Sequence, residues 1–197
     1  MYSDKICQSF CSDRVSCYNS GIKGKYYDEH RIMFVLHRSD SRAIKEYEHA
    51  INSLDLHAGI EDPYVYALRK SDTGRLLRWL TSYCGMTEDD VYITNLFKCL
   101  IPEDKEPRMD EYKACAGLLR DQVLEHKPRK ILVFGGKPFH YMFPEISKTN
   151  TFESMISHEE LYMDTPSLIL NHPRRLHGLK GLERQEYFVK IRNFLKK

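Results

Sequence analysis

The sequence predicts an α/β fold, a three-layer α/β/α sandwich with a central four-stranded parallel sheet. Short strand-like runs alternate with helical patterns along the chain, which is typical of βαβ units. The strand-like runs are apolar at successive positions, not at alternate ones, which indicates strands that are buried on both faces. Because parallel strands are joined by right-handed helical crossovers, we expect helices on both faces of the sheet.

Each element follows from a local pattern. Four strands are expected, at 32–37, 91–95, 130–135 and 167–171. The first helix is expected after Ser71, a residue type that caps helix N-termini, and it places leucines at helical spacing. The expected helices cover 73–84, 110–126, 138–142 and 182–195. The polar segment 19–28 contains two glycines and is expected to be a loop.

The length and composition indicate one globular domain. The 197 residues, 42% hydrophobic and 29% charged, are enough for one well-buried domain spanning 1–197. No apolar run approaches the roughly 18 residues of a membrane span, and the opening MYSDKICQSF lacks the basic start and apolar run of a signal peptide. We therefore expect a cytoplasmic protein, without membrane contact and monomeric.

The charge is unevenly distributed, although the formal net charge is only +2. Residues 172–197 contain eight Lys and Arg against two Glu, whereas 144–166 contain five acidic residues against one Lys. A basic C-terminal segment is compatible with phosphate contacts, and equally with a solvated amphipathic helix.

The cysteine content favours a metal centre. Six cysteines in a reducing compartment are poorly explained by disulfides. Three of them lie in a cysteine-rich segment at 1–20, and Cys99 and Cys115 have fifteen residues between them, with Cys115 near a predicted helix start. Cys84 falls on the apolar side of a predicted helix and is expected to be a core residue.

Ligands of open parallel sheets bind beyond the carboxyl ends of the strands. That rule singles out the segments 37–40, 95–98, 135–136 and 171–173. His37, Arg38, Ser39 and Asp40 lie at the end of the first strand, and Gly135 and Gly136 lie at the end of the third. The second strand ends at Asn95, and the fourth ends at Asn171, which His172 and Pro173 follow.

Four motifs of the chain together resemble the iron-sulfur branch of the uracil-DNA glycosylase superfamily, families 4 and 5. The resemblance covers roughly residues 73–177 and is carried by TGRLL at 73–77, YITN followed by KC at 92–99, KPRKILVFGG at 127–136 and NHP at 171–173. It implies the same α/β/α fold and a DNA glycosylase that holds a flipped uracil, or a modified pyrimidine, and hydrolyses its N-glycosidic bond.

The resemblance also implies a [4Fe-4S] cluster held by four cysteines. Cys99 and Cys115 are the expected distant pair, with Cys7 and Cys11 as the local pair and Cys17 as a possible substitute. The family usually has two residues between its N-terminal cysteines, but here three separate Cys7 from Cys11 and five separate Cys11 from Cys17. Zinc in a four-cysteine site is the alternative.

Further roles follow from the matched motifs. Asn95 is expected to read the base edge, because an amide both donates and accepts, with Arg38 and Ser39 beside it. His172 is expected to stabilise negative charge on the leaving base. In the segment after it, Arg174, Arg175 and His177 are expected to contact DNA, and Leu176 to fill the vacated base stack.

The first motif departs from the family pattern. Where family 4 has a glycine-rich turn with a glutamate that positions water, this chain has LHRSDS at 36–41. Arginine is not a base at neutral pH, so Asp40 or His37 is expected to position the water. Two alternatives remain open: a DNA-binding protein that has lost hydrolysis, and a base-modifying enzyme on the same fold, for example in phage DNA modification.

Overall fold

The computed structural model describes residues 16–17, 21–38, 68–100 and 105–197. A six-stranded sheet in the order β2-β4-β3-β6-β8-β7 forms its centre. These strands are β2 (Ile22–Lys23), β3 (Ile32–Leu36), β4 (Val91–Asn95), β6 (Lys130–Phe134), β7 (Glu159–Tyr162) and β8 (Thr165–Leu170). A separate antiparallel pair joins β1 (Ser16–Cys17) to β5 (Cys99–Leu100).

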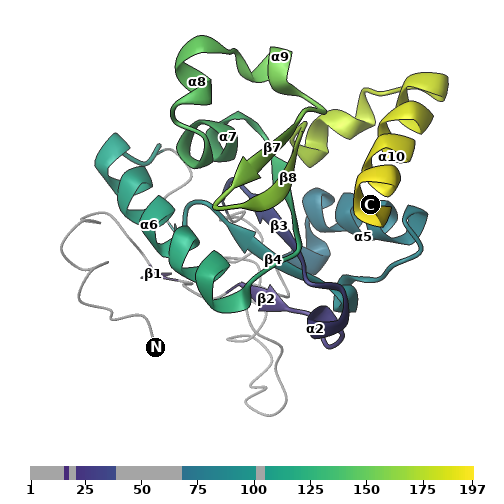
Figure 1. The fold of residues 1–197 in the computed structure, drawn as a ribbon, viewed down its shortest axis with the longest axis horizontal. Coiled ribbons are helices and arrows are strands. Elements are labelled where there is room, and N and C mark those ends of the chain that lie inside the picture. The colour runs from purple at the N-terminus through teal and green to yellow at the C-terminus, as the bar shows by residue number, and fades with distance from the viewer. Residues whose placement is uncertain (1–15, 18–20, 39–67, 101–104) are drawn as a thin grey trace, which may run out of the picture.

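Helices cover both faces of the sheet. The longer ones are α5 (Asp72–Tyr83), α6 (Met109–His126), α7 (Gly136–Met142) and α10 (Gly181–Lys196). Shorter helices are α2 (Tyr27–His30), α8 (Ile146–Thr149), α9 (Phe152–Met155) and the 3-10 turns η1 (Glu88–Asp90) and η2 (Pro173–His177). Figure 1 shows α6 and α7 on one side of the sheet and α5 and α10 on the other.

Each strand of the sheet centre contributes to two cores. Met33 and Val35 of β3 belong to a buried cluster with α6 and α7, which we call the α6 face. Ile32, Phe34 and Leu36, the alternate residues, belong to a second cluster with α5 and α10, the α5 face. This alternation follows from the two-residue period of a strand, and it confirms the predicted three-layer sandwich.

The expected four-stranded parallel sheet is the centre of a larger mixed sheet. Strands β4, β3, β6 and β8 pair in parallel, but β2 and β7 add antiparallel edges that the prediction missed. Edge strands are short and exposed on one side, so they lack the continuous apolar pattern of buried strands. The segment 19–28 is also not simply a loop, since it contains β2 and the start of α2.

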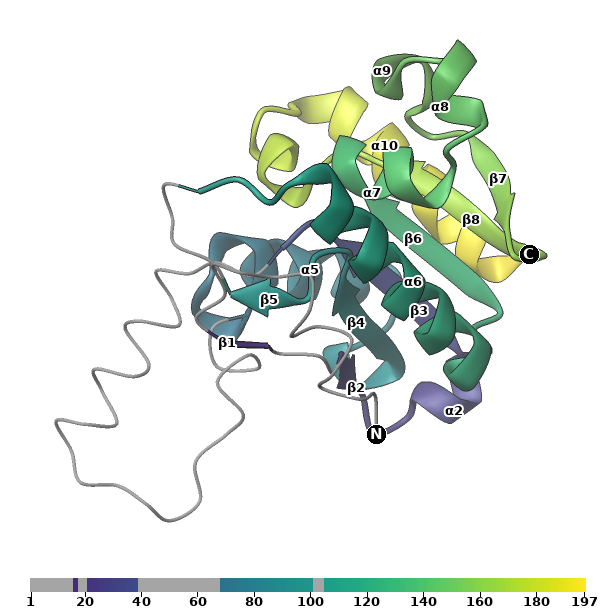
Figure 2. The ribbon, with the colours of Figure 1, turned by 90° about the vertical axis from the view of Figure 1, so that its left-hand side faces the viewer.

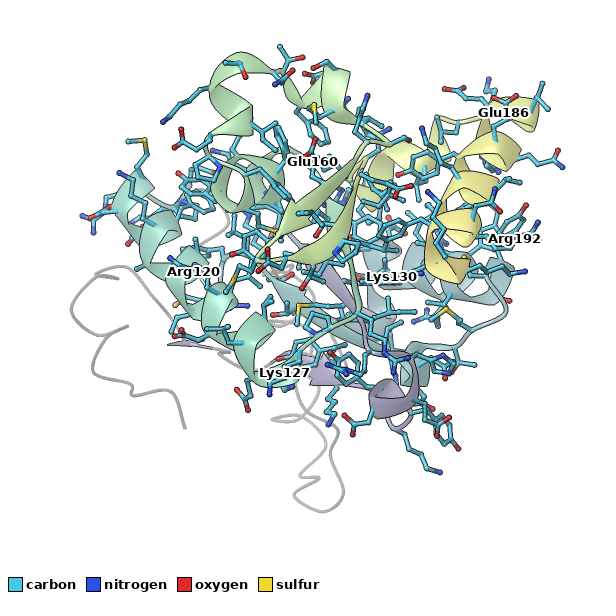
Figure 3. All side chains as sticks on the ribbon, in the orientation of Figure 1. Arg120, Lys127, Lys130, Glu160, Glu186 and Arg192 are labelled. Atoms are coloured by element: carbon cyan, nitrogen blue, oxygen red, sulfur yellow. The ribbon has the colours of Figure 1, made fainter. Side chains whose placement is uncertain are left out.

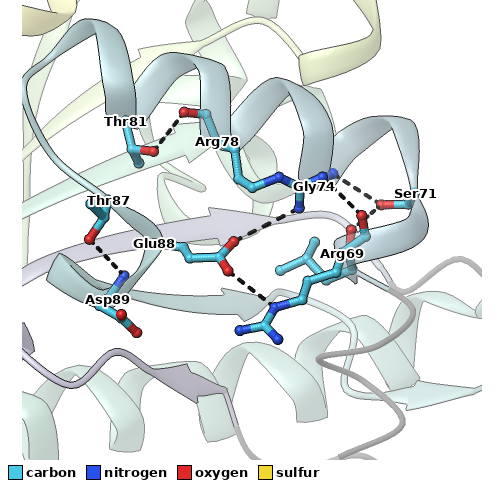
Figure 4. Close-up of polar contacts among 9 residues, drawn as sticks. Arg69, Ser71, Gly74, Arg78, Thr81, Thr87, Glu88 and Asp89 are labelled. Carbon is cyan, nitrogen blue, oxygen red and sulfur yellow. Dashed lines mark hydrogen bonds and ion pairs between the residues drawn. The ribbon is translucent and has the colours of Figure 1, made fainter. Parts of the chain in front are cut away.

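Polar contacts at the start of α5 join this helix to the turn before β4 (Figure 4). The Ser71 hydroxyl accepts a hydrogen bond from the Gly74 amide at 3.0 Å and so caps the helix. Glu88 of η1 accepts a hydrogen bond from Arg69 at 3.1 Å and lies 3.8 Å from Arg78 of α5. These contacts join α5 and the residues before it to η1, the turn that leads into β4.

The C-terminal end of α10 is joined to the start of β6. Lys130, labelled in Figure 3, lies at the start of β6 and donates to the carbonyls of Phe194 and Leu195 at 2.7 and 2.8 Å. A lysine at these last carbonyls satisfies helix-end acceptors that have no partner within the helix. Within the described ranges, no helix is long and apolar enough to cross a membrane.

Candidate active site at the carboxyl edge of the sheet

The parallel strands bring the segments after β3, β4, β6 and β8 to one edge. Leu36 lies opposite Asn95 in the pairing of β3 with β4, and the Phe97 amide donates to the His37 carbonyl at 2.9 Å. On the other side, the Gly135 amide donates to the Leu170 carbonyl at 2.8 Å. Four chain segments far apart in sequence therefore meet along this edge.

Gly135 makes room for His172 at the end of the neighbouring strand. Its φ of 99° lies in the region that favours glycine, where the chain turns from β6 into α7. A Cβ built on Gly135 would lie 3.6 Å from the His172 Cβ and Cδ2 atoms. The backbone of the β6–α7 turn therefore lies directly against the His172 side chain.

The proton position on His172 follows from its hydrogen bonding. Its Nδ1 accepts a hydrogen bond from the Arg174 amide at 3.3 Å, which caps η2. Burial, followed by the charges of Arg174 and Arg175, lowers the pKa of His172 below its ordinary value. The ring is therefore neutral at pH 7 with its proton on Nε2, and it offers one N–H donor.

Two asparagines lie where β4 and β8 reach this edge. Asn95, the last residue of β4, is buried with 4% of its surface exposed. Asn171 follows β8, and its Oδ1 is buried without a hydrogen bond from any residue of the described chain. Its backbone amide donates to the Tyr187 hydroxyl at 3.0 Å, which ties the loop to α10. A buried amide oxygen that accepts nothing is suited to a bound ligand.

His37 is joined to two residues that the sequence did not indicate. His37 Nε2 lies 2.6 Å from the Tyr112 hydroxyl of α6, and that hydroxyl donates to Glu106 Oε1 at 2.8 Å. Tyr112 is 1% exposed. Glu106 and Tyr112 are separated from His37 by some seventy residues of sequence, so no local pattern could have linked them.

Arg38 is engaged with the same acidic residue. Its guanidinium lies 3.5 Å from Glu106 Oε2 and donates to the Lys105 carbonyl at 3.1 Å. Lys137 Nζ lies 3.6 Å from Glu106 Oε1. Arg38 therefore helps to hold Glu106, a contact that its expected role at the base did not include. Ser39 and Asp40, the other candidates of this turn, lie outside the described residues.

A cleft of about 730 Å³ opens beside His172. Its basic residues are Lys137, His140, Lys148 and Arg175, against one acidic residue, Glu153. Its other lining residues are Gly135, Gly136, Ser147, Thr149, Asn150, Thr151 and Phe152. A concave surface with this charge and several hydroxyls is suited to a phosphate-bearing ligand. The α8–α9 part of it was not predicted, because the segment 144–166 is acidic overall.

The η2 turn separates the four residues expected to contact DNA. Arg174 and Arg175 are exposed, and Arg175 lines the cleft. Leu176 is 1% exposed and packs in the core of the α5 face. The expectation that Leu176 inserts into a base stack does not fit this burial, because apolar core residues of a turn anchor it to the domain. The His177 side chain lies outside the described part of the chain.

Two of the expected cluster ligands lie in one core. Cys99 and Cys115 are 3% and 2% exposed and belong to the buried cluster of the α6 face. The β1–β5 pairing places the Cys17 backbone directly opposite Cys99. Cys7 and Cys11 lie outside the described residues, and within the described ones no group of three or more His, Cys, Asp or Glu is arranged to hold a metal ion.

Cys84 has a different environment. It is half-buried at the end of α5 and packs against the core of the α5 face, on the other side of the sheet from Cys99. Burial raises the pKa of its thiol to about 11, so this cysteine remains protonated at neutral pH. Its contacts agree with the expected packing role.

The chain is similar to proteins of known family. The sequence model of the Uracil DNA glycosylase superfamily matches residues 22–196. A Type-4 uracil-DNA glycosylase of Saccharolobus solfataricus is 35% identical over 75 residues, 38% of this chain and 35% of the relative. The enzyme of the same name from Pyrobaculum aerophilum is 39% identical over 62 residues, 32% of each chain.

A third relative, the Type-4 uracil-DNA glycosylase of Archaeoglobus fulgidus, is 30% identical over 82 residues, 42% of this chain and 39% of its own length. The matched segments thus span only about a third of the length of these curated relatives. The superfamily match, by contrast, includes all four parallel strands and the helices on both faces. The chain belongs to the uracil DNA glycosylase superfamily.

Proposed function

We propose that the protein is a DNA glycosylase that binds a flipped uracil, or a modified pyrimidine, and hydrolyses its N-glycosidic bond. The observation that carries the proposal is the neutral His172 ring, whose Nε2–H is its only remaining donor, at the same sheet edge as Asn95. The names of the Type-4 relatives support the same reaction.

This arrangement suits the charge that the reaction develops. When the bond between the base and C1′ breaks, its electron pair leaves with the base, and negative charge grows on the uracil O2. A fixed N–H donor aimed at that oxygen stabilises the transition state more than the ground state. The Asn95 amide supplies a donor for one carbonyl and an acceptor for the ring N–H, which distinguishes uracil from cytosine.

An oligonucleotide assay tests the proposal. The wild-type protein is incubated with single-stranded DNA that contains one uracil, and alkali-labile sites are scored. We expect His172→Ala to lower the single-turnover rate about 10²- to 10³-fold, as for the loss of one such donor. Asn95→Asp should also lose cleavage, because a carboxylate cannot donate to a carbonyl. No cleavage by the wild type, under conditions in which it binds the DNA, would contradict the proposal.

One observation favours a second function, DNA binding without hydrolysis. Arg38 occupies the turn where the family is expected to have its water-positioning acid, and it is paired with Glu106. In that case, the protein would shift the uracil-containing oligonucleotide in a native gel but not the same oligonucleotide without uracil. The cleavage assay would then give no alkali-labile product.

We further propose that four cysteines hold a [4Fe-4S] cluster. Cys99 and Cys115 are buried on one face, and the β1–β5 register supports Cys17 as a third ligand, with Cys7 or Cys11 as the fourth. When bound, the cluster supplies a covalent cross-link between the N-terminal segment and the domain. Metal analysis distinguishes the candidates: iron and labile sulfide with a brown colour support the cluster, whereas one zinc per colourless chain contradicts it.

A further inference from the structure

Two hydrogen bonds link His37 to Glu106 through the Tyr112 hydroxyl, and each proton in them has one donor. Although partial burial opposes it, the hydrogen bond from Tyr112 and the charge of Arg38 hold the pKa of Glu106 below its usual value, so its carboxylate only accepts. The Tyr112 hydroxyl therefore donates to Glu106. Tyr112 has one proton, so in the 2.6 Å contact His37 Nε2 is the donor and the Tyr112 oxygen the acceptor.

This assignment leaves Nδ1 of His37 as a lone pair at the sheet edge. No residue of the described chain makes a hydrogen bond to it. Burial and the charge of Arg38 lower the pKa of this ring, the titratable groups of His172 and Lys137 add to that effect, and Glu106 opposes it. The pKa of His37 is lowered to about 4, so the ring is neutral at pH 7.

We propose that His37 orients the hydrolytic water through its Nδ1, and that Tyr112 and Glu106 are the positioning residues that fix its tautomer. This inference rests on the proposed glycosylase function. The divergent first motif at 36–41 leaves the water-positioning role open. The inference assigns this role to His37, which follows β3, supported by Tyr112 of α6 and by Glu106 in the segment before α6. Arg38, paired with Glu106, is not a base at neutral pH.

In the proposed step, the C1′–N1 bond breaks and its electron pair leaves on the base anion, while the water oxygen forms a bond to C1′. As that bond forms, the water becomes acidic and its proton passes to His37 Nδ1. The imidazolium is stabilised by the Glu106 carboxylate through the Tyr112 hydroxyl, until the proton is released to solvent and the base anion takes one up. A base as weak as this acts chiefly by orientation.

The tautomer is tested without any activity measurement. Long-range ¹⁵N–¹H correlation spectra of the purified protein at pH 7 distinguish a protonated from an unprotonated ring nitrogen. We expect His37 to be protonated only on Nε2 in the wild type and in Tyr141→Phe, which keeps the ring stacked on Tyr112 and removes only its hydroxyl. Tyr112→Phe should give a mixture of tautomers. A wild-type His37 protonated on Nδ1, or on both nitrogens, overturns the assignment.

The role in hydrolysis is tested by single-turnover cleavage of the uracil oligonucleotide. We expect His37→Ala to be about 10²-fold slower and to be partly rescued by added imidazole. Tyr112→Phe and Glu106→Gln should be roughly tenfold to a hundredfold slower, with Tyr141→Phe unchanged. Full activity of His37→Ala overturns this inference alone. A wild type that releases no uracil overturns the proposed function and the water-orienting role with it, and the spectra still decide the tautomer.

Discussion

Two histidines at the carboxyl edge of the sheet are neutral for the same reason and present opposite groups. Burial lowers the pKa of both His37 and His172, and neighbouring arginines add to the effect. The hydrogen-bond partner of one ring nitrogen decides whether the other nitrogen is a donor or an acceptor. The Arg174 amide donates to Nδ1 of His172, so that the proton lies on Nε2. The Tyr112 oxygen accepts from Nε2 of His37, so that Nδ1 is left as an acceptor. Neutral imidazole thereby supplies a donor after β8 and an acceptor after β3.

The partly buried His37 should make the free energy of unfolding depend on pH. Its folded pKa of about 4 lies below the unfolded value of about 6.5, so the unfolded chain binds the proton more readily. The stabilisation is complete above pH 6.5 and is lost as the pH falls toward 4. Between pH 7 and pH 5 this one group should cost up to about 2 kcal/mol.

The measurement is the change in Tm between pH 7 and pH 5, in the wild type and in His37→Gln, where glutamine can still donate to Tyr112. We expect a smaller fall in the variant. Equal falls in the two proteins would mean that His37 is not held neutral by the fold.

Arg175 is the exposed arginine that lines the cleft beside His172, and it should contact a DNA phosphate. Arg175→Gln is expected to weaken DNA binding and to reduce the slope of log affinity against log salt by about 0.9, the value for one phosphate contact. Arg120, on the outer side of α6 (Figure 3), is the matched control, since it lies outside the cleft. An unchanged slope for Arg175→Gln, measured by salt titration of binding, would remove this contact.

At the scale of single elements, α5 depends on its first turn. A Cβ on Gly74 would lie 1.8 Å from the Leu68 carbonyl oxygen, which is backbone and cannot move aside. Gly74→Ala should therefore lower the free energy of unfolding by roughly 3 kcal/mol or more. Ser71→Ala, which removes the cap shown in Figure 4, should cost about 1 kcal/mol.

Gly117 in α6 is the control for this prediction. It is exposed, and a Cβ there meets nothing within 4 Å. Gly117→Ala should raise the free energy of unfolding by about 0.5 to 1 kcal/mol, because alanine is the better helix former. Denaturation of the three variants beside the wild type checks the order. A stable Gly74→Ala would show that the Leu68 carbonyl does not approach Gly74 as closely as described.

At the scale of the whole molecule, Cys99 and Cys115 lie on the α6 face of the sheet and Cys84 lies on the α5 face. Removal of a cluster ligand should release the N-terminal segment, so Cys99→Ser and Cys115→Ser are expected to lose iron and colour and to melt several degrees lower. Cys84→Ser, on the α5 face, should keep both the iron and the colour. Iron content and Tm check this, and retention of iron by Cys99→Ser would contradict the proposed ligand set.

The sequence predicted the four parallel strands, the long helices and the edge at which the site lies. Those features depend on local periodicity, on helix caps, and on the rule that parallel strands end together, so they can be read from neighbouring residues. Asn95 and His172 are predicted as site residues because their motifs resemble those of a family. The edge strands β2 and β7 were missed, since short exposed strands carry little apolar signal.

Only the tertiary structure decided which side chains meet across the edge. The His37, Tyr112 and Glu106 contacts join the end of β3 to α6 and the segment before it, and Leu176, which the sequence predicts to contact DNA, packs in the core. A local pattern states that a residue is polar or apolar. It does not state which distant residue completes its hydrogen bonds, because that depends on how the layers pack, and this packing also sets the protonation state of both histidines.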